Sequence, residues 1–145
     1  MATLNDPDTI RRLVETPARW AVVGLSSNPG RPAFAVARTL QQLGHDIVAV
    51  HPRAEPVHGA ASYPTVSDVP GHIDVVDLFV NSDRAGAVVD AAIAVGADAV
   101  WLQLGVVDTA AAERALEAGL DVVMDRCPAI EAGRLGLPRA GRHVG

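Results

Sequence analysis

The residues best suited to chemistry form a polar loop at positions 24–31, which is rich in glycine, serine and proline and ends in Arg31. An apolar run that starts at Trp20 leads into this loop, and an amphipathic segment begins at Ala33. This order predicts a strand, a turn and the N-terminus of a helix. The first amides of a helix attract an anion because no helical carbonyl accepts from them. The loop therefore predicts a site for the phosphate of a nucleotide-type cofactor.

Gly24 stands at the end of the apolar run, where a residue without a side chain gives a ligand room at the backbone. A side chain at Gly24 is expected to block the ligand while leaving the fold largely intact, although it could also strain a residue with a positive φ.

Four further segments follow predicted strands, at residues 51–53, 79–83, 103–106 and 125–127, and several of their side chains suit an anion or a hydroxyl group. In a doubly wound sheet, ligands bind beyond the carboxyl ends of the strands. Turn formation alone would explain any single segment, but five of them together favour a ligand site. The candidate site residues are Gly24, Leu25, Ser26, Arg31, Pro32, His51, Pro52, Arg53, Phe79, Val80, Asn81, Gln103, Gly105 and Val106.

The pattern differs from the fingerprint of a dinucleotide site. That fingerprint has a second glycine where Ser26 stands, and an acidic residue at the end of the second strand, where His51 and Arg53 stand. NAD is therefore disfavoured. Arg31 and Arg53 instead suit a ligand with an extra phosphate, because a guanidinium group binds phosphate in a bidentate manner. A solvated surface charge is the alternative for either arginine alone.

The elements that must position these residues alternate along the chain. Strands are predicted at 20–25, 46–50, 74–80, 99–104 and 121–124, and helices at 8–16, 33–43, 85–95 and 110–118, with a short strand and a helical turn within 63–69. Continuously apolar strands are typical of a parallel sheet covered on both faces. The order predicts one doubly wound α/β domain at 18–132, preceded by a helix within 1–17 and followed by a tail at 133–145.

Composition limits the class of protein. The net charge of −5 over 145 residues argues against a broad nucleic-acid interface, and no apolar run approaches the length of a membrane span. The N-terminus lacks the pattern of a signal peptide. Cys127 is the single cysteine, which excludes an intrachain disulfide and fits a reducing compartment. A cytoplasmic protein with neither a nucleic-acid nor a membrane partner is expected.

Six short motifs resemble, in order and spacing, the small stand-alone CoA-binding proteins related to the CoA-binding domain of succinyl-CoA synthetase alpha subunits. The motifs lie at residues 24–26, 31–32, 52–54, 63–64, 101–105 and 124–127. The resemblance implies a Rossmann-like fold with coenzyme A as ligand, its adenosine diphosphate part across the strand ends and its pantetheine arm along the rim. Ala33 departs from the small polar residue that is frequent in these relatives, and His51 departs from their common Asn.

No catalytic constellation stands out in the sequence. The histidines fall in predicted turns, loops or the tail without metal-ligand spacing, and Ser26 suits a hydrogen bond to phosphate better than a nucleophile. Cys127 beside Arg126 fits either thiol chemistry or a structural cysteine.

The expected function is the binding of CoA or acyl-CoA by a non-catalytic or regulatory protein without a metal. One alternative is an NADP-dependent oxidoreductase or another nucleotide-binding Rossmann enzyme. A second alternative is the CoA-binding subunit of an acyl-CoA enzyme completed in trans. The sequence leaves open whether the chain forms a homodimer or joins a partner enzyme.

Overall fold

A computed structural model describes residues 3–139, and its centre is a six-stranded sheet in which all strands are parallel. The strand order is β3-β2-β1-β4-β5-β6. The strands are β1 (Arg19–Val23), β2 (Asp46–Val50), β3 (Ser62–Tyr63), β4 (Val75–Leu78), β5 (Ala99–Leu102) and β6 (Asp121–Met124). The chain winds outward from β1 to β3, crosses back to β4 beside β1, and then winds outward to β6. The winding therefore reverses between β1 and β4, and the predicted doubly wound, Rossmann-like α/β fold is confirmed.

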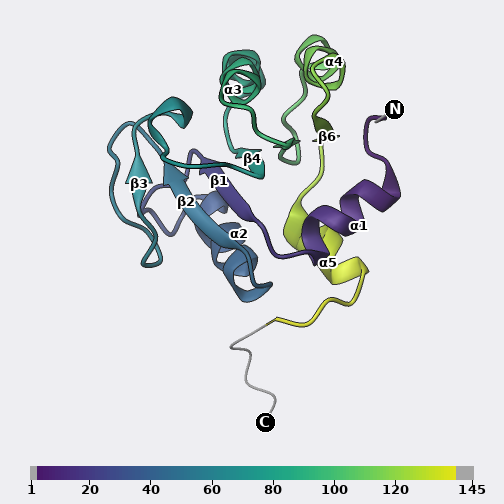
Figure 1. Cartoon of the computed structure of the whole chain (residues 1–145). Helices are drawn as coiled ribbons and strands as arrows, with labels where there is room; N and C mark the ends of the chain where they lie inside the picture. The colour runs from purple at the N-terminus through teal and green to yellow at the C-terminus, as the bar shows by residue number, and fades with distance from the viewer. Residues whose placement is uncertain (1–2, 140–145) are drawn as a thin grey trace.

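The helices cover both faces of this sheet (Figure 1). They are α1 (Pro7–Glu15), α2 (Pro32–Gln42), α3 (Ser82–Val95), α4 (Thr109–Glu117) and α5 (Pro128–Arg134), with a 3-10 turn η1 at Val66–Asp68. Buried residues of α3, α4 and η1 join one apolar core, and those of α1 and α2 join a second core on the opposite face. Leu13 and Val14 of α1 belong to this second core, so the leading helix is part of the domain.

Burial on both faces explains the continuous apolar strands. Every residue of β4 and β5 is buried, including Asp77 in the middle of β4. Trp20 and Trp101 are fully buried on the face covered by α1 and α2, with their ring centroids 5.6 Å apart.

The long predicted strands lie within two residues of their observed bounds, whereas two helices differ from expectation. Helix α3 begins at Ser82, three residues before its predicted start, and α5 was not predicted at all. The predicted tail begins inside α5, and Leu135 and Leu137 pack against the second core. Residues 140–145 of that tail lie outside the described residues. Among residues 3–139, no helix combines the length and the apolar character that are needed to cross a bilayer.

Candidate functional site

A cleft of about 950 Å³ opens at the carboxyl ends of the central strands, where the winding of the sheet reverses. All five predicted segments contribute to its lining, although they are far apart in the sequence. The predicted residues that line it are Gly24, Ser26, Arg31, Pro32, His51, Pro52, Phe79, Val80, Asn81, Gln103 and Val106. The topology therefore brings most of the candidate residues to one site, as the general rule for doubly wound sheets leads one to expect.

Leu25, Arg53 and Gly105 do not line the cleft. Leu25 is fully buried in the core beneath the loop, so it anchors the loop rather than facing a ligand. Gly105 has φ +85°, and its amide donates to Oδ1 of Asp125 over 2.7 Å, which connects the end of β5 to the end of β6. Arg53 is exposed, and its backbone amide donates to Nδ1 of His51 over 3.1 Å.

The structure shows why position 24 is occupied by glycine. Its φ is +96°, and a Cβ atom built on it would lie 2.2 Å from the carbonyl oxygen of Phe79. Its amide donates to the carbonyl of Val50 over 2.8 Å. The neighbouring strand ends therefore require glycine here before any ligand arrives. This corrects the expectation that the fold would stay largely intact, and it supports the alternative that a side chain would strain the backbone.

Two helices direct their N-termini at the cleft. Arg31 and Asn81 occupy the N-cap positions of α2 and α3, and neither makes a side-chain hydrogen bond to its own helix within the described chain. Both residues line the cleft. Pro32 has no amide hydrogen, and the third amide of each helix donates to the carbonyl of its N-cap residue. The amides of Ala33, Ser82 and Asp83 have no acceptor among the described residues, so they are available to a bound anion, which the helix dipoles also favour.

The loop before α2 is held by its own polar side chains. The amide of Asn28 donates to Oγ of Ser26 over 3.3 Å, and the amide of Gly30 donates to Oδ1 of Asn28 over 2.9 Å. The hydroxyl of Ser27 donates to Glu55 over 2.6 Å, which ties the loop to the segment after β2. Ser26 therefore has a role in shaping the turn, in addition to lining the cleft.

The lining at both ends of the cleft is mostly apolar, apart from Thr65 and Arg84. One end lies between η1 and α3 and is lined by Pro64, Thr65, Val66, Arg84, Ala87, Val88 and Ala91. The other end is lined by Val36, Leu104, Cys127 and Ile130. The lining residues of α3 have the spacing of one helical face. This wall of the cleft can therefore be predicted from the sequence once the bounds of α3 are known. Cys127 belongs to the predicted segment 125–127, whereas Ile130 was not identified as lining because α5 was not predicted.

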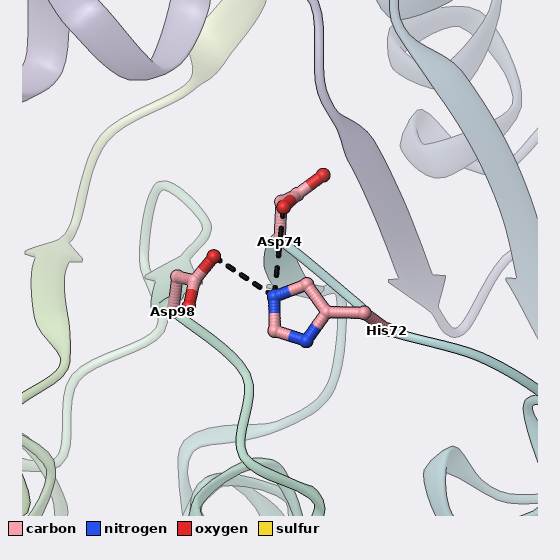
Figure 2. A group of neighbouring side chains, drawn as sticks. All are labelled: His72, Asp74 and Asp98. Carbon is pink, nitrogen blue, oxygen red and sulfur yellow. Dashed lines mark hydrogen bonds and ion pairs between the residues drawn. The ribbon is translucent and has the colours of Figure 1, made fainter.

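A second cluster of chemically capable side chains lies at the opposite edge of the sheet, where β4 and β5 begin (Figure 2). Nε2 of His72 lies 2.9 Å from Oδ2 of Asp98 and 3.6 Å from Oδ1 of Asp74. The other oxygen of Asp74 accepts from the backbone amide of Arg19 over 2.7 Å. The hydrogen bond to Asp98 and the negative charge of that carboxylate raise the pKa of His72. Nε2 of His72 therefore lies beside two carboxylates, and both of them raise the pKa of the imidazole.

The fold and the cleft at its winding reversal place the chain among the Rossmann-like α/β proteins. The profile of the CoA binding domain family matches residues 18–133, so the chain belongs to that family. The resemblance expected from the six motifs is thereby confirmed.

Three relatives illustrate this membership. The uncharacterized protein YneT of Bacillus subtilis is 30% identical over 118 residues, which cover 81% of this chain and 87% of that protein. The solved structure of a hypothetical protein from Pyrococcus horikoshii OT3 has 38% identity and a TM-score of 0.84, over 90% of this chain and 92% of that chain. A dinucleotide-forming acetyl-coenzyme A synthetase from Ca. Korarchaeum cryptofilum has 26% identity and a TM-score of 0.68, over 80% of this chain and 27% of that chain.

Proposed function

We propose that this protein binds coenzyme A or a short acyl-CoA in the cleft, as a non-catalytic or regulatory protein. The observation that carries the proposal is the cleft itself. It lies at the winding reversal of a chain that belongs to the CoA binding domain family, and the N-termini of α2 and α3 both open into it. Because CoA carries a diphosphate and a further phosphate, these uncapped amides suit its anionic part.

The lining supports a division of the cleft between the parts of CoA. The diphosphate suits the N-terminus of α2, where Ser26 and Arg31 stand. The adenine ring suits the apolar wall of α3 at Ala87 and Val88, opposite η1. For the 3′-phosphate, Arg53 remains the predicted ligand, beside Pro52 at the rim. Arg84 lines the cleft and is a second candidate for this phosphate.

The titratable side chains favour binding over catalysis. Those that line the cleft are Arg31, His51, Arg84 and Cys127, and no carboxylate of the described residues is among them. General acid–base catalysis commonly uses a pair of groups held within hydrogen-bond distance of the reacting atoms. His51 instead accepts a hydrogen bond at Nδ1 from the backbone of Arg53.

One observation favours a second candidate, a CoA-binding subunit that acts with an enzyme supplied in trans. The chain covers only 27% of the acetyl-coenzyme A synthetase that it resembles, so a comparable module exists within a much larger synthetase. A purified chain that turns over acyl-CoA without any addition would exclude both this candidate and the non-catalytic role.

Two measurements test the proposal directly. Mass spectrometry of the denatured, purified protein should detect co-purified CoA or acyl-CoA rather than NADP. Isothermal titration should then give measurable binding of CoA and much weaker binding of NAD and NADP. Binding of NAD or NADP that is as tight as binding of CoA would overturn the proposal and favour the oxidoreductase alternative.

A further inference from the structure

The cluster formed by His72, Asp74 and Asp98 lies at the opposite edge of the sheet from the cleft, and none of the three residues lines the cleft (Figure 2). The pairing of β4 with β5 creates this cluster. The amide of Ala99 donates to the carbonyl of Asp74 over 2.9 Å, so Asp74 and Asp98 stand side by side just before the two strands. The ring of His72 reaches both carboxylates from the loop before β4. The spacing of the histidines along the chain did not predict the cluster, because only the sheet brings Asp98 to His72.

The two carboxylates carry more negative charge than the neighbouring side chains balance. Like charges at neighbouring positions of adjacent strands are destabilising. The guanidinium group of Arg12 pairs with Asp121. That of Arg19 lies 3.8 Å from Asp46 and donates to backbone carbonyls. Among residues 3–139, both cluster carboxylates form ion pairs with His72 alone, and one imidazolium offsets a single negative charge. The cluster therefore keeps a net negative charge, which suits a divalent cation.

The donor atoms of the cluster are spaced as the ligands of one metal ion are. Nε2 of His72 lies 2.9 Å from Oδ2 of Asp98 and 3.6 Å from Oδ1 of Asp74. One donor atom from each of the three residues lies within 4.8 Å of the other two. Zinc bonds of about 2.0–2.2 Å to nitrogen and carboxylate oxygen place the ligand atoms of a tetrahedral site roughly 3.3–3.6 Å apart. We propose that His72, Asp74 and Asp98 bind a divalent transition-metal ion of the zinc class.

The surroundings of the cluster suit this ion. An imidazole nitrogen favours Zn²⁺ over Mg²⁺ and Ca²⁺, which take oxygen ligands. The second oxygen of Asp74 accepts from the amide of Arg19 over 2.7 Å, which orients that carboxylate. Asp74 and Asp98 also line a small cavity of about 240 Å³, which leaves room for water to complete the coordination of the metal. The ion takes the place of the proton that Nε2 of His72 donates to Asp98 in the metal-free protein.

The bound ion joins the loop before β4 to the start of β5. Because its three ligands converge only in the folded chain, binding stabilises the fold by mass action. The site is independent of the proposed function, since it uses no residue of the cleft.

Titration of Zn²⁺ into the metal-free, tag-free chain tests the proposal. Isothermal titration should give one site, and saturating zinc should raise the melting temperature. His72→Ala and Asp98→Asn should each weaken zinc binding at least tenfold, because the loss of an outer-shell partner alone commonly costs ten- to hundredfold. The side chains of His72 and Asp98 are 55% and 63% exposed, so the metal-free variants should remain folded. Tryptophan fluorescence checks their fold.

Asp46→Asn is the matched control. Asp46 is an exposed carboxylate at the start of β2, on the same edge of the sheet but outside the cluster. Its removal should leave zinc affinity within about twofold of wild type, because solvent and salt screen an exposed charge. Paramagnetic Co²⁺ then locates the ion by NMR. The amide signals of residues 72–74 and 98 should shift or broaden most, and those of the loop at 24–31 should change least.

Three results would overturn the proposal. The first is a wild-type chain that binds no zinc at millimolar concentration. The second is equal zinc affinity in wild type and His72→Ala, which would place the ion elsewhere on the chain. The third is a loss in Asp46→Asn as large as the loss in Asp98→Asn, which would show attraction to negative charge in general rather than coordination.

Discussion

The α-carbon of Gly24 faces the carbonyl oxygen of Phe79 across the ends of β1 and β4, and a Cβ atom on Gly24 would lie 2.2 Å from that oxygen. The two strands run side by side at this point, with Val23 paired to Leu78 in the register. The loop that begins at Gly24 is thus fixed to the adjacent strand end before any ligand binds.

Gly24→Ala should therefore destabilise the fold as well as weaken binding. The backbone strain at φ +96° and the collision with Phe79 should together lower the free energy of unfolding by roughly 2–4 kcal/mol, measured in urea. Gly105→Ala is the matched control, because Gly105 also has a positive φ but no atom lies within 4 Å of its Cβ position. The free energy of unfolding of Gly105→Ala should be lower than that of wild type by about 1–2 kcal/mol. An equal decrease in the free energy of unfolding of both variants would show that the contact with Phe79 does not destabilise Gly24→Ala.

The 3′-phosphate of CoA should contribute to affinity if an arginine binds it. Wild type should bind 3′-dephospho-CoA more weakly than CoA by roughly 1.5–3 kcal/mol, the scale of a hydrogen bond to a charged group. Arg53→Ala should abolish most of this difference in isothermal titration. If Arg53→Ala still discriminates as wild type does, Arg53 is not the ligand. Arg84→Ala, which removes an arginine of the cleft wall, and Arg31→Ala are then the variants to compare.

Asp77 should make the protein less stable as the pH rises. The residue is fully buried, neither carboxylate oxygen has a partner among the described residues, and burial raises its pKa well above the ordinary value. Above about pH 4 the unfolded chain releases this proton while the folded chain retains it, so proton release favours unfolding. The free energy of unfolding should fall from about pH 4 upward until the pH passes the folded pKa.

Asp77→Asn has nearly the same shape and does not ionise, so it should remove this part of the pH dependence. The free energy of unfolding of each protein is measured in urea at pH 4.5 and pH 8. Relative to wild type, the variant should be more stable at pH 8 than at pH 4.5. If the free energy of unfolding changes by the same amount in both proteins between these pH values, Asp77 is not uncharged in the core.

His72 should titrate above its ordinary pKa because it donates to Asp98 and lies beside that negative charge. A histidine whose pKa is raised by folding stabilises the fold at pH values below its unfolded pKa, and this contribution is lost as the pH rises through the folded pKa. Titration of the imidazole by NMR should give a lower pKa in Asp98→Asn than in wild type. An unchanged pKa would show that the contact with Asp98 is not maintained in solution.

The sequence predicted the sheet well because its strands are buried on both faces. The run from Val75 to Leu78 is apolar except for Asp77, which is typical of a strand that is buried on both faces. Each long strand also ends near a glycine or a polar turn, which marks its end in the sequence. The rule that ligands bind at strand ends then located the cleft, because it depends on topology rather than on any single side chain.

The residues that escaped prediction did so for physical reasons. Helix α5 has only seven residues, with Gly133 inside it, so it offers little helical period to detect. Arg84 and Ala87 lie on one face of α3, whereas the rule for doubly wound sheets points only to the strand ends. Arg53 follows a lining residue directly, yet adjacency in sequence does not determine on which side of the backbone a side chain lies.

The burial of Trp20 against Trp101 has a practical consequence for all of these measurements. They are the chain's two tryptophans, both are fully buried, and neither lines the cleft. Their fluorescence should report the integrity of the core on the face where α1 and α2 pack, and should change little when a ligand fills the cleft. Emission spectra and calorimetry thus observe separate events, so a variant that has lost its ligand can be distinguished optically from one that has lost its fold.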